Sequence, residues 1–164
     1  MIEFKVSRRA LLGFGTAGIA ALALVRSPSS AAAPTLLTVS HSPAEWKRLL
    51  GPDRFAVLRE AKTENPFTSA LLNEHRPGTF ICAGCALPLF SSTTKFESGT
   101  GWPSFWKALP GGIVTRADHS MMLERTEVLC ARCRGHLGHV FDDGPKPTRL
   151  RYCMNGLALN FHPA

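Results

Sequence analysis

The sequence predicts a mainly β domain preceded by a short helical segment. From Thr79 onward, short runs rich in β-forming residues alternate with clusters of Gly, Pro and Asp, which is typical of strands joined by turns. Before Thr79, capping and breaking residues instead delimit segments with apolar residues at helical spacing. The 164 residues correspond to about one domain, and a hydrophobic content of 45% excludes a disordered chain.

Two short helices are expected between residues 42 and 61. Ser42 can cap the first helix and Pro43 suits its first position, whereas Gly51-Pro52 is expected to end it. Residues 69–75 are expected to form one further helical turn. The antiparallel strands are expected at 79–81, 87–90, 112–116, 121–129, 139–141, 151–154 and 157–161.

The N-terminus has the pattern of an export signal. Arg8 and Arg9 precede an uncharged apolar run over residues 10–25, and small residues follow at 30–33. The run is shorter than the roughly 20 residues of a membrane-spanning helix, and the paired arginines resemble a twin-arginine signal. An ordinary secretory signal and an uncleaved anchor are the alternatives.

This pattern divides the chain into an export signal (1–33), a linker (34–42) and a folded domain (43–164). We therefore expect an exported, periplasmic protein without stable membrane insertion after cleavage. The formal net charge is +7, but the signal holds four basic residues and one acidic residue, so about +4 remains. No concentrated basic stripe is present, and no nucleic-acid partner is expected.

Four of the five cysteines form two C-x-x-C pairs, Cys82 with Cys85 and Cys130 with Cys133. Two such pairs predict a closed tetrahedral site for one structural zinc ion. Disulfides or redox-active pairs are the alternatives, because disulfides are normal in exported proteins. The symmetric placement of the pairs favours zinc, as does the absence of a strand-to-helix junction typical of thioredoxin-like motifs.

The fifth cysteine, Cys153, is the candidate nucleophile. Arg151 precedes it by two residues and lies on the same face of a regular strand, where a cation favours the thiolate. His136, His139 and Asp143 lie shortly upstream and can converge on the same site. An odd cysteine in an exported protein is otherwise an intermolecular disulfide partner.

Two long stretches of the chain resemble the methionine-R-sulfoxide reductase family, MsrB. They are CAGCALPLFSSTTKFESGTGWPSFW and EVLCARCRGHLGHVFDDGPKPTRLRYCMNGLALNF, in which GWPSF, HLGHVF and RYC-x-N are specific in combination. The resemblance covers about residues 43–162. It implies two antiparallel β-sheets with short N-terminal helices, and reduction of methionine-R-sulfoxide, free or in proteins.

The resemblance also implies roles for individual residues. Cys153 would attack the sulfoxide sulfur and become a sulfenic acid, and either His136 or His139 would supply the proton. Asp143 would orient an imidazole or hold a water molecule. Trp102 would receive the methyl group of the substrate. The family pattern further places Arg151 and Asn155 beside the nucleophile and makes zinc ligands of Cys82, Cys85, Cys130 and Cys133.

One departure from the family concerns regeneration of the enzyme. Many members have a resolving cysteine before GWPSF, where this chain has Thr100. The resemblance therefore implies an external reductant, either a thioredoxin-like protein or a small thiol. The sequence leaves open the electron donor, the preferred protein substrates and the oligomeric state.

Two other classes of protein compete with this interpretation. In a zinc-stabilised binding module, Cys153 would be incidental. In a thiol–disulfide oxidoreductase, one C-x-x-C pair would carry the chemistry.

Overall fold

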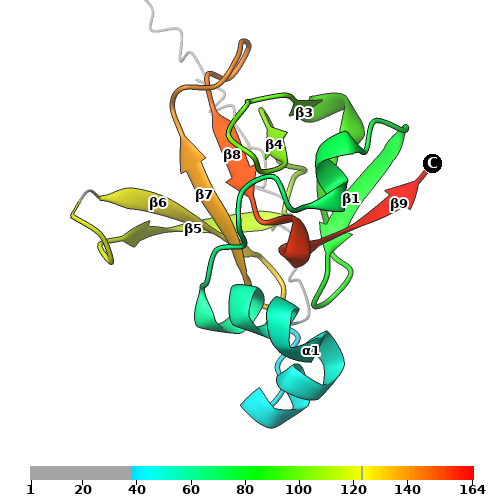
Figure 1. Ribbon diagram of the computed structural model, residues 1–164, viewed down its shortest axis with the longest axis vertical. Helices are drawn as coiled ribbons and strands as arrows, with labels where there is room; N and C mark the ends of the chain where they lie inside the picture. The colour runs from blue at the N-terminus through cyan, green and yellow to red at the C-terminus, as the bar shows by residue number, and fades with distance from the viewer. Residues whose placement is uncertain (1–37, 123) are drawn as a thin grey trace, which may run out of the picture. The chain divides into compact units, whose positions relative to one another are not determined.

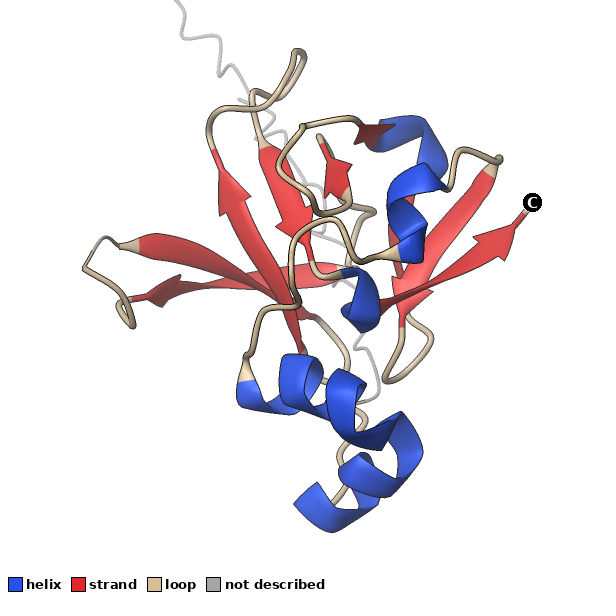
Figure 2. Cartoon of the chain, viewed as in Figure 1, coloured by secondary structure: helices blue, strands red, loops and turns tan. Residues whose placement is uncertain are grey.

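Two antiparallel sheets and one α-helix make up the fold (Figures 1 and 2). The computed structural model describes residues 38–122 and 124–164, so the expected export signal and the first four residues of the expected linker lie outside the described residues. The mainly β class and the two sheets are confirmed. None of the described helices is long and apolar enough to cross a membrane.

The smaller sheet has three strands and the larger has six. In spatial order, the smaller consists of β2 (Pro88–Ser91), β1 (Gly78–Cys82) and β9 (Leu159–Pro163). The larger consists of β3 (Lys95–Phe96), β4 (Ser104–Phe105), β8 (Arg151–Met154), β7 (His136–Phe141), β6 (Arg125–Cys130) and β5 (Ile113–Asp118). Three short 3₁₀ helices complete the fold: η1 (Ala70–Asn73) lies between α1 and β1, η2 (Ser92–Thr94) follows β2, and η3 (Gly156–Ala158) follows β8.

The helix α1 (Pro43–Glu60) begins and breaks where the sequence predicts. The Ser42 hydroxyl accepts a hydrogen bond from the Glu45 amide at 3.2 Å, and Pro43 occupies the first helical position. Gly51 has a non-helical φ of 72° and ψ of 172°, so two helical pieces meet at the expected break. The expected turn after residue 69 is confirmed as η1.

Aromatic side chains from both sheets form the centre of the core. Phe80 on β1 contacts Phe105 on β4 with ring centroids 4.9 Å apart, and Phe90 on β2 stacks on Phe105 at 4.4 Å. All three side chains are fully buried. This packing holds β4, which lies between β3 and β8 in the larger sheet, against the smaller sheet.

Two expected strands begin more than one residue later than predicted, β7 begins three residues earlier than predicted, at His136, and two observed strands were not predicted. β6 begins at Arg125, because Met121 and Met122 lie exposed in the preceding turn. β9 begins at Leu159, because η3 occupies the residues before it. β3 and β4 have two residues each, which is too short to give a pattern of alternating residues in the sequence.

Candidate active site and four-cysteine cluster

A bulge in β7 brings the two histidines to the same face of the larger sheet. Residues three apart in a regular strand point to opposite faces. Leu129 pairs with His136 whereas Val128 pairs with Gly138, so β7 contains one extra residue between these pairs. The rings of His136 and His139 consequently lie 5.5 Å apart, centroid to centroid.

The register of the neighbouring strands adds the nucleophile to this face. His139 pairs with Cys153 on β8, and Cys153 pairs with Ser104 on β4. Directly opposite residues of an antiparallel pair share a face of the sheet. Gly138 permits the close approach of β7 and β8, because a Cβ there would lie 2.1 Å from the carbonyl oxygen of Cys153.

Cys153 lies in a small pocket of about 140 Å³ on this face. The pocket combines one thiol, one imidazole and two aromatic side chains with polar neighbours. Its lining residues are Thr63, Trp102, Arg125, Gly138, His139, Phe141, Cys153 and Asn155. The structure therefore brings together four of the residues selected from the sequence: Trp102, His139, Cys153 and Asn155.

The Cys153 thiol is protonated at rest, because burial raises its pKa. Hydrogen bonding and charge oppose this effect: Thr100 and Arg151 both lower the pKa, and the Thr100 hydroxyl lies 3.8 Å from the Cys153 sulfur. The sequence correctly predicts the direction of the Arg151 effect. It does not reveal that desolvation is the larger effect, because burial is a property of the fold.

Each histidine is held by its own carboxylate. His139 donates from Nε2 to Asp118 at 2.7 Å, and Asp118 also accepts from Arg125 at 2.7 Å. The hydrogen-bond donors around Asp118, Ser120 first among them and His139 and Arg125 also, keep its pKa well below the usual range. The carboxylate is therefore ionised, and His139 must be the donor. Neither Asp118 nor Arg125 was predicted from the sequence as a site residue.

His136 lies behind His139 and outside the pocket lining. It is 4% exposed, and its Nδ1 lies 2.7 Å from Glu127, whose other oxygen accepts from Arg116 at 2.6 Å. Burial lowers the pKa of His136, so the ring is neutral at neutral pH. The position suits a structural support for the site better than a proton donor to substrate.

Asp143 contacts neither imidazole. Its carboxylate accepts two hydrogen bonds from Arg151, both at 2.8 Å, and its side chain is 59% exposed. The Arg151 guanidinium also stacks over Phe141 at 4.4 Å from the ring centroid. Asp143 thus orients Arg151 beside the pocket instead of a histidine.

The missed carboxylates left a signal in the sequence. Residues 116 and 118 carry opposite charges, as do residues 125 and 127, and the two pairs lie across one hairpin. Oppositely charged cross-strand pairs stabilise a shared face. Arg116 pairs with Glu127 and Asp118 with Arg125 in the observed register. This alternation could have identified the face, although not the histidines that it supports.

Asn155 and Trp102 both form hydrogen bonds with the backbone of Glu64, which was not predicted from the sequence as a site residue. The Glu64 amide donates to the Asn155 side-chain oxygen at 3.0 Å, and the Glu64 carbonyl accepts from Trp102 Nε1 at 3.1 Å. Asn155 Nδ2 also donates to the Leu137 carbonyl at 3.2 Å. Both pocket walls are therefore tied to the segment that follows α1.

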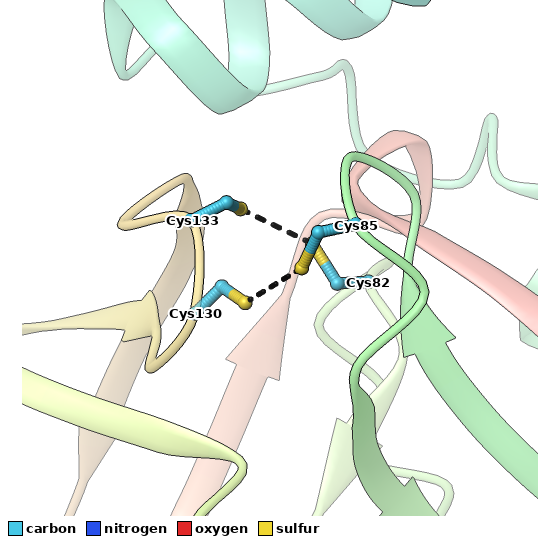
Figure 3. A group of neighbouring side chains, drawn as sticks. All are labelled: Cys82, Cys85, Cys130 and Cys133. Carbon is cyan, nitrogen blue, oxygen red and sulfur yellow. Dashed lines mark hydrogen bonds between the residues drawn. The ribbon is translucent and has the colours of Figure 1, made fainter. Parts of the chain in front are cut away.

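The remaining four cysteines gather where the ends of β1 and β6 and the turns after them meet. Figure 3 shows one pair on the turn after β1 facing the other pair on the turn between β6 and β7. The four sulfurs lie within 4.8 Å of one another; Cys82 is 3.6 Å from Cys133, and Cys85 is 3.5 Å from Cys130. No disulfide links them, and the cluster can hold a metal ion.

The spacing of the sulfurs matches a tetrahedral ion. Sulfurs 2.3 Å from a central zinc ion would be about 3.8 Å from one another. The turns are also anchored, because Arg59 on α1 donates to the Cys133 carbonyl at 2.9 Å and Arg132 donates to the Cys85 carbonyl at 3.1 Å. The first contact ties the second turn to α1, and the other links the two turns directly.

Known proteins have sequences similar to this chain. Residues 50–163 match the SelR domain family. The peptide methionine sulfoxide reductase MsrB of Leptospira interrogans is 51% identical over 124 residues, which are 75% of this chain and 95% of that protein. The MsrB proteins of Thiobacillus denitrificans and Bradyrhizobium diazoefficiens are each 52% identical, over 73% and 76% of this chain and 92% and 91% of their own lengths.

A solved structure, the Yippee-like domain of Mis18, is 17% identical and covers 54% of this chain and 98% of its own, with a TM-score of 0.43. That likeness carries no functional argument. The domain match and the high identity over nearly the full length of the relatives do: this chain belongs to the MsrB family of peptide methionine sulfoxide reductases.

Proposed function

We propose that this protein reduces methionine-R-sulfoxide, free or in proteins, to methionine, with Cys153 as the nucleophile. The observation that carries the proposal is the pocket that joins Cys153, His139 and Trp102 on one face of the larger sheet. The other four cysteines are gathered in the cluster, so Cys153 is the thiol available to a substrate.

The pocket residues can complete a balanced reaction. The Cys153 sulfur attacks the sulfoxide sulfur. The bond between the substrate sulfur and its oxygen breaks, and the oxygen becomes bonded to the Cys153 sulfur. Methionine is released, and Cys153 becomes a sulfenic acid, so the substrate is reduced by two electrons and the cysteine is oxidised by two. The Cys153 thiol proton passes to the sulfoxide oxygen by way of the second ring nitrogen of His139, because His139 lines the pocket whereas His136 is buried behind it.

Trp102 is suited to select the substrate. Its ring forms part of the pocket wall, and its indole N–H is already bonded to the Glu64 carbonyl. The ring therefore offers the substrate an apolar, polarizable face instead of a hydrogen-bond donor. Such a face makes favourable contacts with a thioether and its methyl group.

Regeneration requires an external thiol. The position of a resolving cysteine is occupied by Thr100, whose hydroxyl faces Cys153 at 3.8 Å. Two thiol equivalents, from a thioredoxin-like protein or a small thiol, would reduce the sulfenic acid to the Cys153 thiol with release of water and formation of a disulfide. After one turnover without reductant, mass spectrometry should find a trappable sulfenic acid on Cys153 and no intramolecular disulfide.

We infer that the four-cysteine cluster holds one zinc ion with a structural role. The spacing of the sulfurs and the all-thiolate ligand set support zinc, and four protein ligands leave no open position for a substrate. When bound, the ion would link the turn after β1 to the turn before β7. Metal analysis should find one zinc per chain.

We also propose export to the periplasm by the twin-arginine route, on the strength of Arg8, Arg9 and the apolar run at 10–25. Replacing both arginines with lysine should leave the precursor in the cytoplasm. Unchanged export would indicate the general secretory route instead.

The function itself is tested with separated sulfoxide epimers. With dithiothreitol as reductant, the protein should convert the R epimer of methionine sulfoxide in a model peptide and leave the S epimer unchanged. Equal rates on both epimers, or no turnover of either, would contradict the proposal. A Cys153→Ser variant measured in parallel excludes activity from a contaminant.

A further inference from the structure

Glu64 connects separate parts of the pocket, although its side chain is not among the pocket-lining residues. It lies between α1 and η1, where its amide donates to Asn155 and its carbonyl accepts from Trp102. Trp102 and Asn155 are 53 positions apart in sequence and form separate parts of the pocket lining. The backbone of one residue therefore bridges two walls of the substrate pocket.

The carboxylate of Glu64 holds this bridge in place. The residue is 9% exposed, and its two oxygens accept hydrogen bonds from the amides of Gly156 and Leu157, the latter at 3.1 Å. These amides begin η3, directly after Asn155. The Glu64 carboxylate thus holds the start of η3, and the Glu64 backbone holds the adjacent Asn155.

The surroundings leave little freedom for a different arrangement. A Cβ at Gly156 would lie 1.8 Å from the Ser69 hydroxyl and 3.3 Å from Glu64 Oε1, so the turn packs directly on the Glu64 side chain. Burial raises the pKa of Glu64, and the two amide donors oppose that effect. A buried carboxylate that accepts two amides cannot be replaced by an amide side chain without placing an NH₂ group against one N–H donor.

We propose that Glu64 is a positioning residue that sets the separation of Trp102 and Asn155 and thereby the affinity for the sulfoxide. The inference rests on the proposed function, because it requires Trp102 to contact the substrate. Glu64 acts through its neighbours and does not take part in the chemical step. Its loss should weaken substrate binding while Cys153 and His139, which are held by β7 and β8, keep their geometry.

The test compares Glu64→Gln with the matched variant Glu60→Gln in single-turnover reduction of methionine-R-sulfoxide. Glu60 is an exposed carboxylate on α1 that pairs only with Lys62, at 3.1 Å, among the described contacts. Loss of one hydrogen bond to a charged group should raise the half-saturating substrate concentration about tenfold in Glu64→Gln. The maximal rate should change less than about threefold, and Glu60→Gln should match wild type.

A double-mutant cycle distinguishes positioning from general destabilisation. Trp102→Phe keeps an aromatic ring but removes the N–H that bonds to Glu64. If Glu64 acts through Trp102, the combined variant should bind the sulfoxide about as weakly as the weaker single variant. Glu64→Asp keeps the charge and should recover part of the affinity. It also serves as the second variant if Glu64→Gln does not fold.

The outcomes separate this inference from the proposed function. An unchanged half-saturating concentration in folded Glu64→Gln or Glu64→Asp would overturn the inference, as would fully additive effects in the cycle. If instead Trp102→Ala left substrate affinity unchanged, the proposed role of Trp102 would fail, and with it the basis for the positioning role. Failure of wild-type protein to reduce the sulfoxide would overturn the function itself.

Discussion

Cysteine side chains occupy two different environments in this protein, the four-cysteine cluster and the Cys153 pocket. In the cluster each sulfur has the three other sulfurs within 4.8 Å. Cys153 has no sulfur partner and lies in a pocket of about 140 Å³, next to an imidazole and an indole ring. One setting suits a metal ion and the other a small polar molecule with an apolar methyl group.

The difference shows that neighbours decide what a cysteine does. Convergent thiols at tetrahedral spacing favour a closed ligand shell, which removes all four from reaction. A single thiol with a raised pKa is protected from indiscriminate reaction, because the thiolate is the nucleophile and is scarce at neutral pH. The substrate and the pocket must then supply the conditions for attack.

The largest expected effect separates the two settings directly. Cys153→Ser should abolish sulfoxide reduction while the zinc content and the thermal unfolding midpoint stay close to wild type. Cys130→Ser should lose the metal and unfold, because structural zinc contributes on the order of 10 kcal/mol to small zinc domains. Activity assays, metal analysis and thermal denaturation measure these effects. Full activity in metal-free protein with two disulfides would show that the cluster is misinterpreted.

A smaller effect sharpens the comparison by distinguishing His139, which lines the pocket, from His136, which does not. His139→Asn should lower the maximal single-turnover rate by about 10²-fold or more, which is typical for loss of a general acid. His136→Asn should act mainly on stability, lowering it by about 1–3 kcal/mol, because it removes the imidazole partner of Oε1 in the buried Glu127 carboxylate.

Rapid-quench kinetics and denaturant unfolding of both variants provide the two measurements. The assignment of proton donation to His139 would be wrong if fully folded His136→Asn lost more of its rate than His139→Asn.

The smallest expected effect concerns the Cys153 thiol alone. Because burial raises its pKa, its alkylation by iodoacetamide should accelerate with rising pH, about tenfold per unit, up to a pKa above the ordinary value of 9.0. Arg151→Met removes a cation that lowers this pKa, so its midpoint should lie higher still and alkylation at a fixed pH should be severalfold slower. A midpoint below the ordinary value would instead indicate a preformed thiolate.

Much of the fold was predictable because its signals are local. Ser42, Pro43 and Gly51 mark the beginning and the break of α1 through capping, restricted φ and positive φ, which need no tertiary contact. Most strands are visible from β-forming residues between turns. β3 and β4 were not predictable, since two-residue strands owe their existence to the partners that they pair with.

The candidate site was predictable in its residues but not in its contacts. Cys153, His139, Trp102 and Asn155 meet in the pocket, as the resemblance to the family implies. The ion pair of Asp143 with Arg151, and the carboxylates that hold the histidines, depend on which strands lie side by side. Strand pairing between distant segments cannot be derived from one segment alone.

The sequence by itself determined the helix boundaries, the two C-x-x-C pairs, the unpaired Cys153 and the family, because spacing and residue type carry these features. Only the tertiary structure decided that a one-residue bulge turns His136 and His139 to the same face, and that desolvation outweighs the charge of Arg151 at Cys153. It also decided that Glu64 ties Trp102 to Asn155. Register and burial arise from contacts between distant segments, and a linear pattern does not contain them.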